Sequence, residues 1–272
     1  MKQKIKWLTL LIAMIVIHSF VRAGNYNFYG DARSAGMSNS VIMSPKLSLM
    51  QNQASLGWGE NSGLSLYSFY RPQLPQLSVV AAHGHFNLWG GGFGVQMQRF
   101  GDNAYNENKI GLGYGKQLGD HFSAGVQFNY LYTDISGPYQ TYHNFVAEAG
   151  VQAAFGDKWL FGVHVYNPTL SRIGDKEEVP ETIVRVGAGV QVTSDFLLTS
   201  EVEKHIDKDI NFKVACDYEF EMGLNIQAGV QSAPGQASLG VGYEFSQFAV
   251  QVAVNTNTYL KPGTHFTVHY QF

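Results

Sequence analysis

The sequence predicts an all-β fold, namely a transmembrane antiparallel β-barrel of about 14 strands with an N-terminal hatch segment in its lumen. Three observations predict it. Stretches of about ten residues alternate between apolar and polar side chains through most of the chain. The chain ends on such a stretch, 265–272, with Phe272 last. Charged residues make up only 14% of the chain, aromatic residues also 14%, and 30 residues are glycine, which suits a barrel in lipid.

The first segment, 1–23, is predicted to be a signal peptide. Three lysines form its positive end, an apolar run follows over 7–17, and small residues for cleavage lie within 21–23. The run is shorter than the about 20 residues of a membrane-spanning helix. We therefore expect export by the Sec pathway. Because the only cysteine is Cys216, neither lipid attachment at the cleavage site nor an internal disulfide is expected.

The next segment, 24–60, lacks alternation of period two and is predicted to be a hatch or plug rather than part of the barrel wall. Within it, 31–37 and 46–52 are each expected to form one or two helical turns. Pro45 would begin the second of them.

The region 61–272 is predicted to form the barrel, because its side chains alternate with period two. Phe122, Val126 and Phe128 share one face of a strand, for example, and Gln127 lies on the other. Strand centres are expected near residues 66, 80, 94, 112, 127, 149, 163, 186, 201, 215, 227, 241, 252 and 268. The count of about 14 is even, as in single-chain bacterial barrels, with 12 and 16 as alternatives.

The last strand is predicted to be the membrane-assembly strand. Its lipid-facing residues would be Phe266, Val268, Tyr270 and Phe272. A closing strand of this kind, ending on an aromatic residue, is typical of barrels in the cell outer membrane of Gram-negative bacteria. The expected partners are therefore outer-membrane lipid and the barrel assembly machinery. Because an open edge is not tolerated in lipid, this strand must pair with the first one, near 63–70.

Two stretches carry a family resemblance. Gly30-Asp31-Ala32-Arg33-Ser34-Ala35-Gly36-Met37 and Met50-Gln51-Asn52-Gln53-Ala54-Ser55-Leu56 resemble the N-terminal region of the FadL/TodX and PorV/PorQ-like superfamily. The stretches 164–168, 180–182 and 201–204 are also similar to that superfamily. The resemblance implies a 14-stranded barrel with the hatch inside, and it assigns Arg33 and Asn52 to the hatch. Gln53 replaces the proline of the family's Asn-Pro-Ala motif, and the long extracellular loops are missing.

The resemblance implies two alternative functions. FadL/TodX-like members pass small hydrophobic molecules across the outer membrane, which is the function we expect first. PorV/PorQ-like members are non-transporting components of a type IX secretion or surface-attachment system, and secretion-system proteins would then be partners. An outer-membrane enzyme with a catalytic site at the barrel rim is the third class, but Ser171 and Ser246 have no evident histidine or acidic partner.

A charge network is predicted on the inward faces of three consecutive strands. Its members are Arg185, Glu201, Glu203, Lys213, Asp217 and Glu219. Antiparallel counting puts Arg185 opposite Glu203 or His205, and Lys213 opposite Glu201 or Glu203. The network is interpreted either as a constriction that selects solutes or as a structural network that fills the barrel or pairs with Arg33. The structural interpretation is favoured, because charges in the lumen of a barrel are normal.

Glycines recur at positions expected to face inward, and they make room for an occupant of the lumen. These are Gly90, Gly92, Gly94, Gly111, Gly113, Gly115, Gly187 and Gly189. The hatch is favoured over a ligand path as that occupant, because strand glycines usually mark a close approach of backbone.

The remaining chemistry-bearing residues predict no cofactor. The nine histidines include His83 with His85 and His265 with His269, but no neighbouring ligands match a structural metal site. The net charge of −3 gives no reason to expect nucleic-acid binding. Cys216 is expected to point to lipid as a small hydrophobic side chain.

Overall fold

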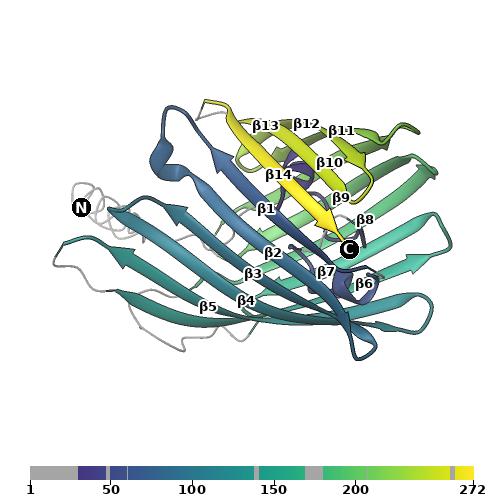
Figure 1. Ribbon diagram of the computed structural model, residues 1–272, viewed down its shortest axis with the longest axis horizontal. Helices are drawn as coiled ribbons and strands as arrows, with labels where there is room; N and C mark the ends of the chain where they lie inside the picture. The colour runs from purple at the N-terminus through teal and green to yellow at the C-terminus, as the bar shows by residue number, and fades with distance from the viewer. Residues whose placement is uncertain are drawn as a thin grey trace, which may run out of the picture.

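A computed structural model describes residues 30–46, 50–59, 61–137, 141–168, 180–206, 208–257 and 261–272. The predicted signal peptide, 1–23, lies outside these residues. Fourteen antiparallel strands close into one barrel (Figure 1). The strands are β1 (Gly63–Tyr70), β2 (Val79–Leu88), β3 (Gly91–Gly101), β4 (Tyr105–Leu118), β5 (Phe122–Ile135), β6 (Tyr142–Phe155), β7 (Trp159–Tyr166), β8 (Ile183–Thr193), β9 (Phe196–His205), β10 (Ile210–Glu219), β11 (Leu224–Ser232), β12 (Gly235–Phe245), β13 (Phe248–Asn257) and β14 (Gly263–Gln271).

Each strand pairs with its neighbours in sequence, and β14 closes the barrel against β1. Their register runs from Gly63 opposite Gln271 to Tyr70 opposite Thr264. The predicted count of 14 is therefore confirmed over the alternatives of 12 and 16, and so is the predicted closing pair. At the end of the barrel where β14 stops, short turns such as Trp89–Gly90 join the strands, and we call this end the turn end. The opposite end is the loop end.

The two faces of the wall differ as the alternation predicts. Outward side chains are large and apolar, and Leu66, Phe128 and Leu239 are 66%, 69% and 66% exposed. Inward side chains such as Gln127 and Asn225 are polar and buried. This is the pattern of a wall with lipid outside and a polar lumen. Among the described residues, no helix is long and apolar enough to cross a membrane.

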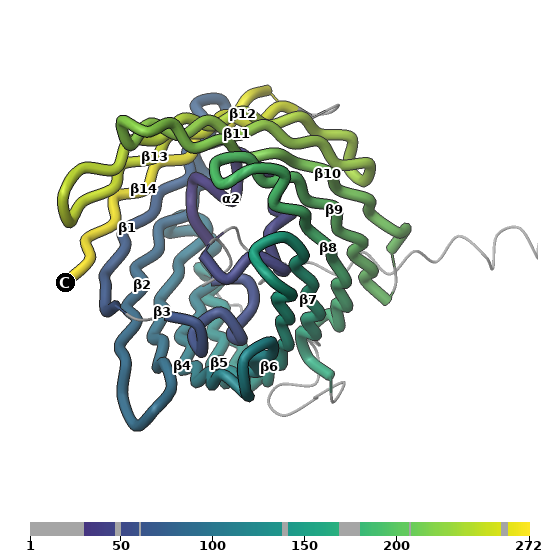
Figure 2. The backbone as a smooth tube through the Cα atoms, turned by 90° about the vertical axis from the view of Figure 1, so that its right-hand side faces the viewer, coloured from purple at the N-terminus to yellow at the C-terminus, as the bar shows by residue number. Residues whose placement is uncertain are grey.

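The described parts of the N-terminal segment run through the inside of the ring, where Figure 2 shows them as a purple and dark blue tube. Helix α2 (Ala32–Gly36) begins after Asp31, whose side chain accepts a hydrogen bond from the Ser34 amide at 2.7 Å. A 3₁₀ turn, η1, follows at Gln53–Gly57. The two pieces contact opposite parts of the wall: α2 lies against β11–β14, and η1 against β3–β6.

The second helical turn does not lie where the sequence predicted it. Residues 50–52 are not helical, 47–49 lie outside the described residues, and η1 begins only after Asn52. The reason is local, because the Asn52 side chain accepts a hydrogen bond from the Ala54 amide and so acts as an N-cap. The prediction used Pro45 as the start signal and overlooked this asparagine.

Glycines on the inner wall leave room for the backbone of the N-terminal segment. A Cβ atom on Gly125 or Gly115 would overlap the backbone of Gln53, and one on Gly229 would overlap the backbone of Met37. Of the inward glycines that the sequence indicated, Gly92 and Gly115 meet the backbone of the segment, and Gly94, Gly113, Gly187 and Gly189 meet its side chains. Gly111 and Gly90 are the exceptions, because Gly111 adjoins side chains of the wall, and Gly90 sits in a turn with φ of +72° and has open space around it. The prediction of Gly90 as an inward strand residue was wrong, since Trp89 and Gly90 form the turn between β2 and β3.

Candidate functional site

The predicted charge network divides into two groups, and the first is a ladder across β8, β9 and β10. Lys213 Nζ lies 2.9 Å from Glu201 Oε1 and 2.9 Å from Glu203 Oε2. Arg185 Nε lies 3.0 Å from Glu203 Oε2. The register puts Arg185 opposite Glu203 and Lys213 opposite Glu201. All four side chains are buried, and each charge has an oppositely charged partner within this site, which excludes water.

This ladder also binds the N-terminal segment. Glu201 Oε2 accepts from the amides of Val41 and Ile42, at 3.2 and 3.4 Å. Arg185 Nη1 donates to Gln51 Oε1 at 3.4 Å. Glu201 therefore satisfies two backbone donors of the segment as well as Lys213. Burying those amides without an acceptor would cost free energy.

The second group, Asp217 and Glu219, does not join the ladder and instead binds Arg33 of α2. Arg33 Nη2 lies 2.6 Å from Asp217 Oδ2 and also contacts Glu219, while Nη1 lies 2.9 Å from Glu244 Oε1. Burial by itself would lower the pKa of Arg33, but the attraction of Asp217 and Glu219 outweighs it and raises that pKa. Glu244 was missed by the sequence reasoning, although its inward position on β12 was visible.

Solvent reaches this second group. The side chains of Glu219 and Glu244 are 41% and 50% exposed, whereas that of Asp217 is 4% exposed. Exposed ion pairs contribute little, because water and salt screen them. The buried ion pair with Asp217 is thus the main contribution of Arg33 to holding the N-terminal segment in the lumen.

Asn52, the second predicted hatch residue, bonds to three backbone carbonyls with its side-chain amide. Its Nδ2 donates to Ile42 O at 2.8 Å, to Val163 O at 3.3 Å and to Val151 O at 3.4 Å. Its Oδ1 accepts from the Ala54 amide at 3.1 Å. The residue therefore joins the two halves of the segment to each other and to the wall between β6 and β7.

A further charged cluster, centred on Glu148, was not predicted. Its carboxylate accepts hydrogen bonds from Lys109 Nζ at 2.7 Å, His164 Nε2 at 3.0 Å and Gln53 Nε2 at 2.9 Å. Asn129 Nδ2 adds a fourth at 2.8 Å. These residues come from β4, β5, β6, β7 and η1, and all are buried. The available signal was that Lys109 on β4 and Glu148 on β6 both fall on the inward face, with only β5 between them.

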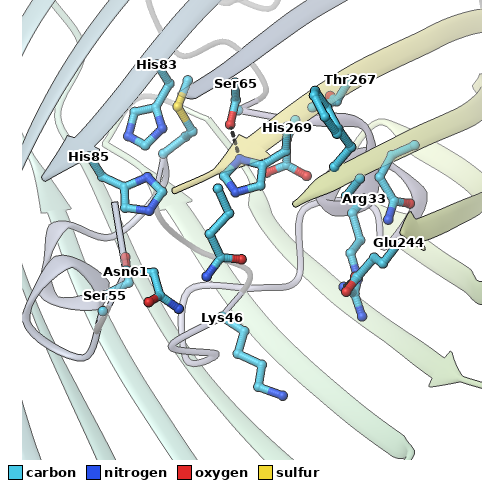
Figure 3. Close-up of a pocket in the computed structure, with 18 of the residues that line it drawn as sticks. Arg33, Lys46, Ser55, Asn61, Ser65, His83, His85, Glu244, Thr267 and His269 are labelled. Atoms are coloured by element: carbon cyan, nitrogen blue, oxygen red, sulfur yellow. Dashed lines mark hydrogen bonds and ion pairs between the residues drawn. The ribbon is translucent and has the colours of Figure 1, made fainter. Parts of the chain in front are cut away.

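A pocket of about 540 Å³ opens at the turn end, between the N-terminal segment and the strand ends (Figure 3). Figure 3 shows His83, His85 and His269 together on one side and Arg33 with Glu244 on the other. Ser65 Oγ and His269 Nδ1 lie 2.8 Å apart. No group of three or more metal-ligating side chains suited to an ion occurs among the described residues. No residue of this pocket other than Arg33 and Glu219 was predicted as a site residue.

The predicted assembly strand, β14, presents its apolar side chains outward. Phe266 and Phe272 are 45% and 53% exposed, and Val268 and Tyr270 are half-buried. The rings of Phe248 and Phe272 lie 4.8 and 5.8 Å from that of Tyr270, in an aromatic group at the turn end. The Phe272 amide donates to Ser62 O at 2.9 Å, so the last residue still belongs to the closing ladder.

Comparison by sequence finds neither a known protein family nor a curated protein that matches this chain. Comparison by structure does find similar proteins. The toluene transporter TbuX of Ralstonia pickettii has a TM-score of 0.65 at 10% identity, covering 89% of this chain and 97% of TbuX. A Pseudomonas aeruginosa FadL homologue has a TM-score of 0.63 at 12% identity, covering 92% of this chain and 99% of the homologue.

The toluene transporter TodX of Pseudomonas putida is a third, with a TM-score of 0.62 at 10% identity, covering 92% of this chain and 98% of TodX. Identities this low establish a shared fold and leave function open. The chain has the closed fourteen-stranded barrel fold of the FadL, TodX and TbuX outer-membrane proteins.

Proposed function

We propose that this chain is an outer-membrane channel through which small hydrophobic molecules pass. The observation that carries the proposal is the match of nearly the whole barrel to solved toluene transporters. The apolar outer wall supports a place in a lipid bilayer, and the buried N-terminal segment supports control of passage by a plug.

Passage in this proposal requires the N-terminal segment to shift. Helix α2 is the part that would move, because two of the three carboxylates that bind Arg33 are partly solvated. The turn η1 would stay, because its backbone is packed against three inner-wall glycines, Gly92, Gly115 and Gly125, whereas α2 and the residue after it meet two, Gly229 and Gly240. The hatch would thus act as a plug with one fixed part and one movable part.

The test is uptake of p-xylene into vesicles that contain the purified barrel. We expect uptake above that of protein-free vesicles, and faster uptake for Arg33→Gln because the plug is held less firmly. Arg99→Gln is the matched control, because Arg99 is exposed on β3 and contacts no part of the N-terminal segment that the structure describes. Uptake no faster than in protein-free vesicles, for both wild type and Arg33→Gln, would count against the proposal.

Export by the Sec pathway and insertion by the barrel assembly machinery are part of the same proposal. Removing Phe272 should lower the amount of barrel in the outer membrane, since it takes away the terminal aromatic residue and a bond of the closing ladder. The amount of folded protein is measured by heat-modifiable migration of outer-membrane fractions. Wild-type amounts after the deletion would contradict this assignment of β14.

A second candidate is a non-transporting PorV/PorQ-like component of a secretion or surface-attachment system. The observation that favours it is the brevity of two loop-end connections, 102–104 and 233–234, together with the many bonds that hold the segment in the lumen. This candidate predicts no uptake and a partner protein that crosslinks to the barrel in intact cells. A barrel that always isolates alone would exclude it.

A rim enzyme is the least supported class. Ser65 and His269 do form a Ser–His pair, but within the described residues no carboxylate accepts a hydrogen bond from His269. A catalytic imidazole is normally oriented by such a group.

A further inference from the structure

The inner face of the wall carries two apolar patches in the loop-end half of the lumen. The first, which we call the β1–β3 patch, consists of Tyr67, Phe69, Val79, Ala81 and Phe100. The second, the β5–β8 patch, consists of Leu131, Val146, Tyr166 and Ile183. Inward side chains of a barrel in lipid are normally polar, so each patch is a candidate surface for a hydrophobic molecule in the lumen.

Buried charges close the β5–β8 patch on its side toward the turn end. The next inward residues on the four strands are Asn129, Glu148, His164 and Arg185. Lys109 Nζ lies 5.4 Å from the centroid of the Tyr166 ring and 2.7 Å from Glu148 Oε1. A hydrophobic molecule that moved on from this patch would have to displace ion-paired groups, which is costly in a buried site.

The β1–β3 patch has no such barrier. The inward positions of β1 and β2, two strands that the structure describes in full, carry no lysine, arginine, aspartate or glutamate. Toward the turn end the patch passes to Ser65 and His83, which line the pocket of about 540 Å³ (Figure 3). Helix α2 lies against β11–β14 and η1 against β3–β6, so β1 and β2 face the interval between the two pieces. An uncharged column therefore leads from the patch to the pocket.

The side chain of Met50, from the N-terminal segment, lies across this column. It packs against the β1–β3 patch and also lines the pocket. A methionine side chain is unbranched and flexible, and its sulfur makes favourable contacts with aromatic rings, so it can fill such a gap and still change rotamer.

The start of α2 holds Met50 in this position. A Cβ atom on Gly30 would overlap the Cβ atom of Met50, so the backbone of Gly30 lies directly against that side chain. Gly30 precedes Asp31, the N-cap of α2. A displacement of α2 would therefore remove the backbone that confines Met50.

We propose that hydrophobic molecules cross the lumen along the inner face of β1 and β2, and that the Met50 side chain is the gate of this route. When α2 leaves the wall, Gly30 leaves with it, and the Met50 side chain turns away from the patch. This inference rests on the proposed function and deepens it by assigning the route and the residue that closes it. Short turns of single-chain bacterial barrels face the periplasm, so a substrate that passes Met50 reaches the pocket from which it leaves.

The size of the side chain at position 50 tests the gate. We expect p-xylene uptake into vesicles to become about threefold faster in Met50→Ala and about tenfold slower in Met50→Trp. The matched controls are Met97→Ala and Met97→Trp, because Met97 is 54% exposed on the outward face of β3. Heat-modifiable migration verifies that every variant is folded. Wild-type uptake in both folded Met50 variants would overturn the proposal.

A reversible block tests the route. Ala81→Cys and Val146→Cys, each in a Cys216→Ser background, place a thiol in one or the other apolar patch. Modification with benzyl methanethiosulfonate should lower p-xylene uptake to the protein-free level in Ala81→Cys and leave it unchanged in Val146→Cys. A reductant should restore uptake. Equal effects in both variants, or a thiol at position 81 that does not react in the folded barrel, would contradict the route.

Failure of the gate and failure of the channel are distinguishable. Absence of p-xylene uptake in wild type and Met50→Ala would contradict the channel. The rate at which the same reagent modifies Ala81→Cys then still tests the gate, because it should rise when Met50→Ala is added, and an unchanged rate would overturn the gate. Uptake by the wild type that neither the Met50 variants nor the block at position 81 alters would keep the channel and remove the route.

Discussion

The two halves of the N-terminal segment are held in the same lumen by different forces. The first half, around α2, is bound mainly through charges, with Arg33 on Asp217 and the amide of Val41 on Glu201, although its backbone also meets two wall glycines, Gly229 and Gly240. The second half, around η1, is bound through neutral groups and close backbone packing, with Asn52 on wall carbonyls and η1 against glycines. Two of its glutamines also bond to charged side chains of the wall, Gln53 to Glu148 and Gln51 to Arg185.

The difference indicates which half can move. Ion pairs that reach solvent exchange readily with water and salt, so their loss costs little. A turn packed against wall glycines cannot shift without opening voids in the packing. We therefore regard η1 as the anchor and α2 as the movable part, and the following variants test that division in order of expected effect.

The largest loss is expected for Glu148→Leu, which removes the centre of the cluster beside η1. Lys109 and His164 would stay buried without their acceptor, and breaking a buried pair in this way costs about 3–5 kcal/mol. Urea unfolding of the barrel, followed by gel mobility, measures the change in free energy of unfolding. The double variant with Lys109→Leu should recover part of it, and a loss under about 1 kcal/mol in the single variant would contradict the assigned role.

Gly125→Ala should displace η1, because the new methyl group would overlap the backbone of Gln53. We expect a loss of about 1–3 kcal/mol, as for overpacking in a core. A cysteine at Ser55 should then react with a thiol reagent that it resists in the wild type. Gly84→Ala is the control, because that glycine faces outward and its new methyl would meet only side chains. If both variants behave alike, η1 is not the anchor.

Asn52→Ala removes an N-cap and the bonds to Ile42 and Val163. The expected loss is about 1–2 kcal/mol, and it should not depend on salt because no charge is involved. Urea unfolding at low and high sodium chloride measures both quantities. A loss that shrinks with added salt would show that the second half is also held by charge.

Arg33→Gln should have a smaller effect on the free energy of unfolding than Glu148→Leu, about 1–2 kcal/mol, because the glutamine amide can still donate to the buried Asp217 and the other two carboxylates are partly exposed. Asp217 keeps a hydrogen bond from Gln227 Nε2 at 2.8 Å, so its carboxylate still has a hydrogen-bond donor after the substitution. The difference from wild type should decrease as salt is raised, in contrast to Asn52→Ala. A loss above about 3 kcal/mol, or one independent of salt, would mean that α2 is fixed as firmly as η1.

The barrel could be predicted from the sequence because period two and short turns are local signals. Fourteen strands and the closing pair follow from them, and Glu201 is one of the two positions that antiparallel counting allowed opposite Lys213. The Glu148 cluster could not be predicted, because it joins four strands to Gln53. No local sequence pattern indicates which inward polar groups come together in the lumen. The preference of Asp217 for Arg33 over Lys213 likewise depends on where α2 lies in the lumen.

The central claim is that passage through the lumen requires α2 to leave the wall, and a reversible tether tests it most directly. Ser38 Oγ, just after α2, lies 3.0 Å from Ser238 Oγ on β12, so cysteines at both positions can be joined in a Cys216→Ser background. Oxidation should lower p-xylene uptake into vesicles to the protein-free level, and a reductant should restore it, while either single cysteine has no effect. Unchanged uptake through a fully tethered barrel would contradict the account.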